Sequence, residues 1–397
     1  MTQPRALFVD DEPRVLDGLR RSLRGKRGEW EMVFAEGGVA ALALLAQAPF
    51  DVVVSDMRMP GMDGAELLTR ISKIHPQVAR VVLSGHIEPD AAIQVSVAGH
   101  RFLTKPSDAQ SLIDVIEQLL IRTSSAHQSE ARRIAGGVRS IPTLPEHAGD
   151  IVALLAPDAN LSYAVRTATH DIGLTAKLLQ LSNSRFFGER PRNSSVESIV
   201  NAMGVPMVQA VAGAGHQLWS PETPDPTLAR HLKTAWRHAV ATACLVESVA
   251  SPANRPHAQA AALLQDVGRL VCLSVPAGDG HLGIDLAAGT RDGVPFRDVG
   301  VELLHLWGLP LPIVAAVSQR DAPQQPDNSG LGVVAAVRTA HLLIQHTESR
   351  DPAAGTHEEE LARLLSHPQL KAQGIDWPQA ATEASRQAGL WSEHDKP

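Results

Sequence analysis

The first 120 residues alternate between short apolar runs and longer segments in which apolar residues recur at helical spacing. The apolar runs predict five strands, at residues 6–9, 32–34, 52–55, 81–83 and 102–104. Between them, apolar residues three or four positions apart predict helices, as for Leu16, Leu19 and Leu23. Strands that alternate with helices are typical of a parallel sheet covered by helices. The pattern therefore predicts an α/β doubly wound domain with five parallel strands and five helices.

The chain changes character after residue 121. Residues 122–140 are mostly polar and contain Gly136 and Gly137 near their end. This composition predicts a linker that is helical in part. From residue 141 onward the apolar positions fall at helical spacing and no segment alternates as a strand does, so we expect an all-α domain. We place domains at residues 1–121 and 141–345, with the linker at 122–140 and a C-terminal helical extension and tail at 346–397.

Composition narrows the classes of partner. With 36 Lys and Arg against 43 Asp and Glu, the net charge of −7 gives no field that would attract nucleic acid or anionic lipid. No run of roughly 18 apolar residues occurs, which argues against a membrane span. Only Cys244 and Cys272 are present, as is typical of a reducing compartment. We therefore expect a cytoplasmic protein whose partners are other proteins, with nucleic acid and membrane disfavoured.

Polar residues suited to chemistry follow four of the predicted strands. Asp10 and Asp11 follow the first strand, Asp56 the third, Ser84 the fourth and Lys105 the fifth. Because the carboxyl ends of parallel strands meet at one edge of a sheet, these side chains should lie together. Carboxylates suit Mg2+, and a carboxylate can attack phosphorus to give an aspartyl phosphate. A hydroxyl and an ammonium group at the same edge can bind phosphoryl oxygens.

Four phrases in this half, FVDDEP, VVSDMRMPGMDG, VVLSG and RFLTKP, occur in order between residues 8 and 106. Through them the half resembles the receiver domain of bacterial two-component response regulators, which has a flavodoxin-like fold. The resemblance implies that Asp56 accepts a phosphoryl group that Lys105 and Ser84 contact, and that Ser84 and Phe102 form a switch pair. It also implies a Mg2+ site made of Asp10, Asp11, Asp56 and the backbone carbonyl of Arg58.

The helical half resembles the HDOD family, a relative of HD-type phosphohydrolases. The phrases that carry this resemblance are IPTLPEHAGDIVALL, DIGLTAKLLQLSNSRFFG, AWRHAVATA, ALLQDVGRLV and LLHLWGLPLPIVAAV. An HD catalytic site needs several His and Asp ligands to hold one or two metal ions. Here Gln265 precedes Asp266 where an adjacent His-Asp pair is required, and an amide is a poor ligand for a transition metal. We therefore expect His238, Gln265 and Asp266 to be remnants of a degenerate metal site.

Together the resemblances imply a response regulator that receives a phosphoryl group on Asp56 from a histidine kinase or phosphotransfer protein. The HDOD half would transmit the signal to a downstream protein without being an enzyme, and homodimerisation through the receiver is left open. One alternative is a receiver-controlled HD-type cyclic dinucleotide phosphodiesterase with a diverged site, which Gln265 disfavours. A second is a DNA-binding regulator, which would need a basic recognition helix. The helical half shows no concentrated basic segment.

Overall fold

The computed structural model describes residues 3–85, 99–105, 108–120, 126–139, 141, 143–144, 147–183, 195–215, 225–274, 283–322, 331–348 and 358–391. The chain forms two compact units. The first comprises Met1–Ser140, Gln180–Pro191 and Glu302–Gly308, and the second comprises Ile141–Leu179, Arg192–Val301 and Leu309–Pro397. Within the described ranges, no helix combines the length and the apolar character needed to cross a bilayer.

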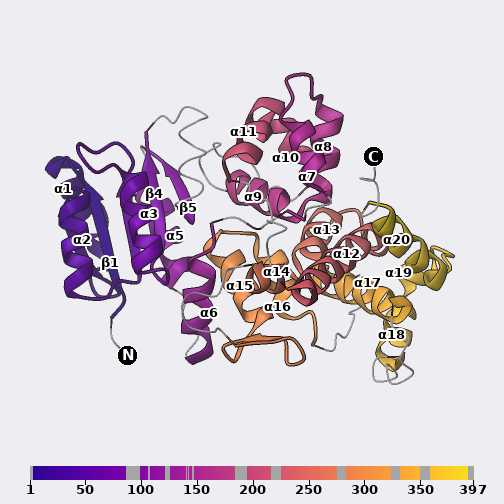
Figure 1. Ribbon diagram of the computed structural model, residues 1–397. Helices are drawn as coiled ribbons and strands as arrows, with labels where there is room; N and C mark the ends of the chain where they lie inside the picture. The colour runs from indigo at the N-terminus through magenta and orange to yellow at the C-terminus, as the bar shows by residue number, and fades with distance from the viewer. Residues whose placement is uncertain are drawn as a thin grey trace. The chain divides into compact units, whose positions relative to one another are not determined.

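A five-stranded parallel sheet is the centre of the first unit (Figure 1). In the order β2-β1-β3-β4-β5, it consists of β1 (Arg5–Asp10), β2 (Glu31–Glu36), β3 (Val52–Asp56), β4 (Ala79–Ser84) and β5 (Arg101–Thr104). Every residue of β3 and β4 is buried, as expected for strands with both faces covered. The predicted strands are confirmed, and each observed strand is longer than predicted by one or two residues at one or both ends.

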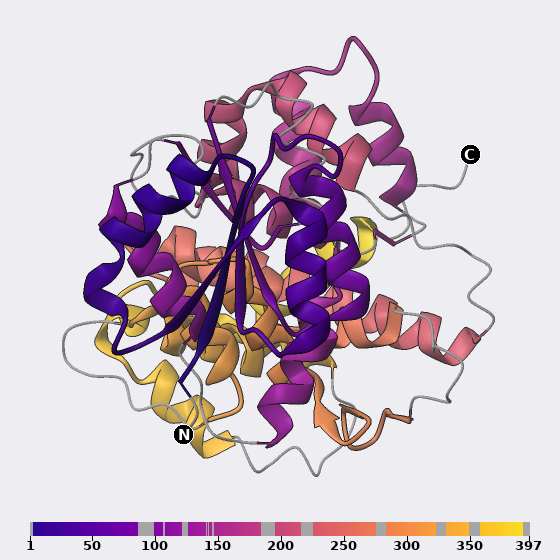
Figure 2. The same cartoon turned by 90° about the vertical axis from the view of Figure 1, so that its left-hand side faces the viewer.

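Helices cover both faces of this sheet (Figure 2). Helices α2 (Gly38–Gln47) and α3 (Gly64–Ile74) lie together on one face, and α1 (Pro13–Ser22) and α5 (Ala109–Leu120) lie on the other. A short 3-10 helix, Arg24–Lys26, follows α1. The helix predicted between β4 and β5 falls on residues 86–98, which lie outside the described residues. The arrangement is the predicted doubly wound fold, and it brings the carboxyl ends of all five strands to one edge.

Helix α6 (Ala126–Gly136) forms in the predicted linker and contacts the start of β4. The side chain of Arg80 is only 1% exposed, and its Nη2 donates to the carbonyl oxygen of Gly136 and to Nε2 of His100, both at 2.8 Å. Burial, together with the nearby charge of Arg139, lowers the pKa of Arg80 to about 9. A Cβ on Gly136 would lie 1.9 Å from the carbonyl oxygen of Pro76, so only glycine fits there. Helix α6 is therefore fastened to the sheet unit at its C-terminus.

The chain after residue 141 is mainly helical. Its helices are α7 (Ala148–Leu154), α8 (Leu161–His170), α9 (Ile172–Ser182), α10 (Val196–Met203), α11 (Val205–Gly215), α12 (Pro226–Val249), α13 (Arg255–Leu264), α14 (Val267–Ser274), α15 (Phe296–Leu306), α16 (Leu311–Ser318), α17 (Val333–Glu348), α18 (Glu358–Leu365), α19 (Pro368–Lys371) and α20 (Trp377–Trp391). The 24-residue helix α12 is the centre of this region and packs against α13, α17 and α20. The predicted all-α class is confirmed, whereas the predicted domain boundaries stay predictions.

A small antiparallel sheet interrupts the helices, contrary to the expectation that no strand occurs in this half. It consists of β6 (Ile284–Asp285), β7 (Thr290–Arg291) and β8 (Val294–Pro295). Asp292 and Gly293 join β7 to β8 with positive φ angles of 52° and 77°, as a type I′ hairpin turn requires. The apolar pattern missed these strands because two residues are too few to show an alternation.

Candidate functional site

A first cluster of polar side chains lies at the carboxyl edge of the five-stranded sheet. Asp10 ends β1, Asp56 ends β3, Ser84 ends β4 and Lys105 directly follows β5. The register of the sheet keeps these ends level, because Asp56 pairs with Leu83, the neighbour of Ser84. The two aspartates and the serine are buried, while the Lys105 side chain is 30% exposed. The structure thus places these four sequence-predicted residues at one edge.

The ammonium group of Lys105 bridges two carboxylates. Its Nζ lies 2.7 Å from Oδ2 of Asp10 and 2.6 Å from Oδ1 of Asp56. Burial alone would lower the pKa of Lys105, but the hydrogen bonds to Asp10 and Asp56 outweigh it and raise the pKa. The ammonium group therefore stays charged at neutral pH. It offsets one of the two negative charges and leaves this pair of carboxylates suited to a further cation.

The turn after β3 fixes Asp56 from the other side. The backbone N–H of Arg58 donates to Oδ2 of Asp56 at 2.8 Å. Gly64 lies so close to this turn that a Cβ would be 2.1 Å from the carbonyl oxygen of Asp56. Asp63 caps α3 by accepting the backbone N–H of Glu66 at 2.8 Å. The Asp-Gly pair at the end of the second receiver-like phrase therefore sets the path of the chain beside Asp56.

The donor chemistry of this cluster fits Mg2+. Asp10 and Asp56 direct oxygens to one point, and Mg2+ normally takes one or two carboxylates and completes its shell with water and phosphate oxygens. Throughout the described parts of the chain, no three His, Cys, Asp or Glu side chains lie close enough to share one ion. Asp11, which is half-buried, and the carbonyl of Arg58 stay predicted ligands. Phe102 is buried in β5, and its switch role likewise stays a prediction.

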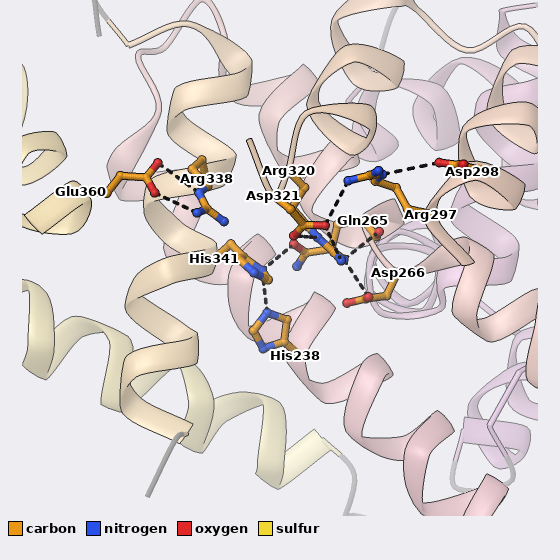
Figure 3. Close-up of polar contacts among 10 residues, drawn as sticks. All are labelled: His238, Gln265, Asp266, Arg297, Asp298, Arg320, Asp321, Arg338, His341 and Glu360. Atoms are coloured by element: carbon orange, nitrogen blue, oxygen red, sulfur yellow. Dashed lines mark hydrogen bonds and ion pairs between the residues drawn. The ribbon is translucent and has the colours of Figure 1, made fainter. Parts of the chain in front are cut away.

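A second cluster of polar side chains lies in the helical unit (Figure 3). His238 comes from α12, and Gln265 and Asp266 come from the junction of α13 and α14. His341 comes from α17, and Arg320 from the turn after α16. The structure thus brings the three predicted remnants together. It adds His341 and Arg320, which the sequence reasoning did not place in this site.

The two histidines are turned toward each other. Nε2 of His238 lies 2.8 Å from Nδ1 of His341, and Nδ1 of His238 lies 3.0 Å from Oε2 of Glu348. Nδ1 of His341 is also 3.1 Å from Oε1 of Gln265. Burial, reinforced by the charges of His238 and Arg320, lowers the pKa of His341 well below 6.5, so its ring is neutral. A proton on Nδ1 of His341 and one on Nδ1 of His238 satisfy all these contacts.

Arg320 neutralises Asp266. Its Nη1 lies 2.8 Å from Oδ1 of Asp266 and 3.1 Å from the carbonyl oxygen of Gln265. Burial alone would raise the pKa of Asp266, but the charge of Arg320 outweighs it and holds the pKa at about 2. Burial lowers the pKa of Arg320, and Asp266 and Asp321 more than reverse this. Because a guanidinium already occupies the carboxylate, these residues do not fit a catalytic metal ion.

Comparison with known proteins agrees with the two-unit organisation. The family model of the response regulator receiver domain matches residues 6–117, and that of the HDOD domain matches residues 141–323. The transcriptional regulatory protein GlrR of Escherichia coli is 36% identical over 123 residues, which are 30% of this chain and 27% of that protein. The hydrogenase transcriptional regulatory protein HoxA of Cupriavidus necator is 31% identical over 167 residues, which are 41% of this chain and 34% of that protein.

The chain therefore spans about a third or less of the length of these two curated relatives. Among solved structures, the signal receiver domain of an HD domain-containing protein from Pseudomonas fluorescens is 32% identical, with a TM-score of 0.29. That match covers 30% of this chain and 95% of the solved one.

Proposed function

We propose that this chain, which matches the family models of a response regulator receiver domain and an HDOD domain, is a two-component response regulator that accepts a phosphoryl group on Asp56 and signals to a protein partner through the HDOD domain. One observation carries the proposal. Lys105 lies between Asp10 and Asp56 at the sheet edge, within 2.7 Å of both carboxylates. This arrangement pairs a nucleophilic carboxylate with a cation that can bind the incoming phosphoryl group.

In the proposed reaction a carboxylate oxygen of Asp56 attacks the phosphorus of a phosphohistidine or of a small phosphodonor. The new O–P bond forms as the P–N or P–O bond to the donor breaks, and the bonding electrons leave with the donor. Lys105 offsets the charge of the phosphoryl oxygens, and the hydroxyl of Ser84 donates a hydrogen bond to one of them. The backbone N–H of Arg58 keeps the Asp56 carboxylate oriented.

A Mg2+ ion would be held by Asp10 and Asp56, with Asp11 and the carbonyl of Arg58 as further ligands, and would neutralise negative charge on the phosphoryl group. The proposed donor protein is a histidine kinase or a phosphotransfer protein, and the proposed place of the reaction is the cytoplasm. A small population shift between two arrangements of the receiver would then carry the signal onward.

For the HDOD domain we propose an output role without catalysis. Gln265 takes the place of an imidazole, and Arg320 occupies the carboxylate of Asp266 at 2.8 Å. A metal-dependent hydrolase needs that carboxylate for its ion. The contacts therefore support a module that binds another protein rather than one that hydrolyses a nucleotide.

The test is phosphorylation of the full-length protein by acetyl phosphate with Mg2+, followed by intact mass spectrometry. The wild type and Asp17→Asn, an exposed aspartate on α1, should each gain one phosphoryl group. Asp56→Asn should gain none, because the amide keeps the shape but lacks the nucleophile. An Asp56→Asn protein that still gained a hydroxylamine-sensitive phosphoryl group would refute the assignment of Asp56.

A further inference from the structure

The cluster in Figure 3 contains more potential metal ligands than its sequence predicts, yet it is arranged around an internal cation. His238, His341 and Asp266 come from three different helical segments and converge on one region. Imidazole and carboxylate are ligands that suit divalent transition metals. Among the residues that the structure describes, no three His, Cys, Asp or Glu side chains lie close enough to share an ion.

We propose that Arg320 is a built-in replacement for a metal ion, and that removing its guanidinium while restoring an imidazole at position 265 creates a divalent-metal site. The proposal rests on the non-catalytic role proposed for the HDOD domain and names the residue that enforces it. It predicts that the guanidinium of Arg320, together with the amide at position 265, keeps His238, His341 and Asp266 from forming a metal site.

The first support is the charge balance around Asp266. The Asp266 side chain is 10% exposed and that of Arg320 is 16% exposed, so their 2.8 Å contact lies largely out of water. A carboxylate buried in this way needs a cation close by. Arg320 supplies it, and its Nη1 also donates to the backbone carbonyl of Gln265 at 3.1 Å. One guanidinium thus neutralises the acid and satisfies the helix junction that carries it.

The second support is the direction of the histidine nitrogens. A ligating nitrogen must point its lone pair at the ion, at about 2.0–2.1 Å for zinc. Here Nε2 of His238 and Nδ1 of His341 are 2.8 Å apart, and the two rings cross at 80°. One nitrogen of the pair therefore donates a hydrogen bond to the other, and the two lone pairs are not directed at a common point.

The third support is the side chain of Gln265, which is 2% exposed. Its Oε1 is 3.1 Å from Nδ1 of His341, but its buried Nε2 has no hydrogen-bond partner. A buried amide donor without a partner is costly, so local hydrogen bonding does not account for this residue. An amide at this position does avoid placing another ionisable ring beside Arg320. Gln265 and Arg320 are therefore expected to act as a pair, and both must change to open the site.

The experiment uses full-length wild type, Gln265→His, Arg320→Met, and the double variant Arg320→Met with Gln265→His. Each protein is stripped with chelator, dialysed against Co2+, and measured by its metal content and its visible absorption spectrum. We expect stoichiometric Co2+ with a ligand-field spectrum in the double variant and no stoichiometric Co2+ in the wild type. Adding Asp266→Ala to the double variant should abolish the binding.

The matched control combines Gln265→His with Arg297→Met. Arg297 is a neighbouring arginine that pairs with Asp321 and Asp298, at 3.4 and 3.6 Å. This control variant should stay free of Co2+, because Arg320 still neutralises Asp266. If Arg320→Met fails to fold without metal, refolding of the double variant with Co2+ or Zn2+ should restore its melting transition. Arg320→Gln, which keeps a donor for the carbonyl of Gln265, repeats the test in a milder form.

The proposal is overturned if the folded double variant stays free of metal, if added metal fails to rescue an unfolded one, or if the Arg297 control binds Co2+ equally well. It is also overturned if the wild type binds stoichiometric Co2+ while Arg320 is intact. Turnover of cyclic di-GMP by the wild type is a separate outcome. That result would refute the non-catalytic role proposed for the domain, whereas a metal-free double variant would refute only the role of Arg320.

Discussion

The receiver and HDOD domains each hold a buried carboxylate against a cationic side chain, but the two pairs differ in what they leave open. In the receiver, Lys105 contacts two carboxylates through one nitrogen, and its side chain is 30% exposed. In the HDOD domain, Arg320 contacts the buried carboxylate of Asp266, the exposed carboxylate of Asp321 and a backbone carbonyl, and its side chain is 16% exposed. An ammonium group is a movable point charge, whereas a guanidinium is a planar fork of fixed directions. The first arrangement suits a reacting group, and the second suits a fixed structural contact.

The largest expected effect comes from breaking the HDOD pair on one side only. Asp266→Ala would leave the Arg320 charge buried without its main partner, so we expect a loss of about 3–5 kcal/mol in the free energy of unfolding. Urea denaturation at pH 7 measures it. Asp321→Ala is the control, because Asp321 is an exposed partner of the same arginine and should cost less than about 1 kcal/mol. Equal losses in the two variants would show that the contact of Arg320 with Asp266 stabilises the fold no more than its exposed contact with Asp321.

A slightly smaller effect is expected in the receiver, and it concerns rate rather than stability. Lys105→Met removes the cation proposed to bind the phosphoryl group, and the rate of phosphorylation by acetyl phosphate should fall about 100- to 1000-fold. Lys26→Met is the control, since Lys26 pairs with Glu29 and Glu117 at the surface. Phosphoprotein gels sampled over time provide the measurement. An unchanged rate in Lys105→Met would mean that the two clusters do not differ in the way proposed.

The smallest expected effect is a dependence of stability on pH that arises from Asp266. The pKa of Asp266 is held at about 2, below its ordinary value of 3.8. A carboxyl whose pKa is lower in the folded state adds stability above its unfolded pKa, and this stability is lost as the pH falls toward the folded pKa. The stability gap between wild type and Asp266→Asn should therefore shrink by about 2 kcal/mol between pH 6 and pH 2. A gap that stayed constant in urea titrations at both pH values would contradict the charge pairing.

The receiver cluster was predictable because its residues follow strands. Once the strands were recognised, the position of Asp56 or Lys105 at a strand end followed from the geometry of a parallel sheet. The two-residue strands β7 and β8 gave no such pattern, although the Asp292-Gly293 pair between them is a recognised hairpin signal.

The HDOD cluster was predictable only in part. His341 lies in an apolar helical stretch, where a single histidine gives no periodic signal, and it is 103 residues from His238. Arg320 follows α16 in a turn, and its pairing with Asp266 depends on tertiary packing across 54 residues of sequence. Local propensity does not encode contacts of this kind, so only the structure could show the internal cation.

The two ends of strand β4 contact two different parts of the receiver unit. Ser84 lies at one end, beside the proposed phosphorylation site at Asp56, and Arg80 lies four positions earlier, a distance of about 13 Å along the strand. The guanidinium of Arg80 donates a hydrogen bond to the last carbonyl of α6, that of Gly136, and Gly136 packs directly against the backbone of Pro76. Strand β4 therefore connects Ser84 at one end to the C-terminus of α6 at the other. We therefore expect a displacement of β4 to change the position of the C-terminus of α6.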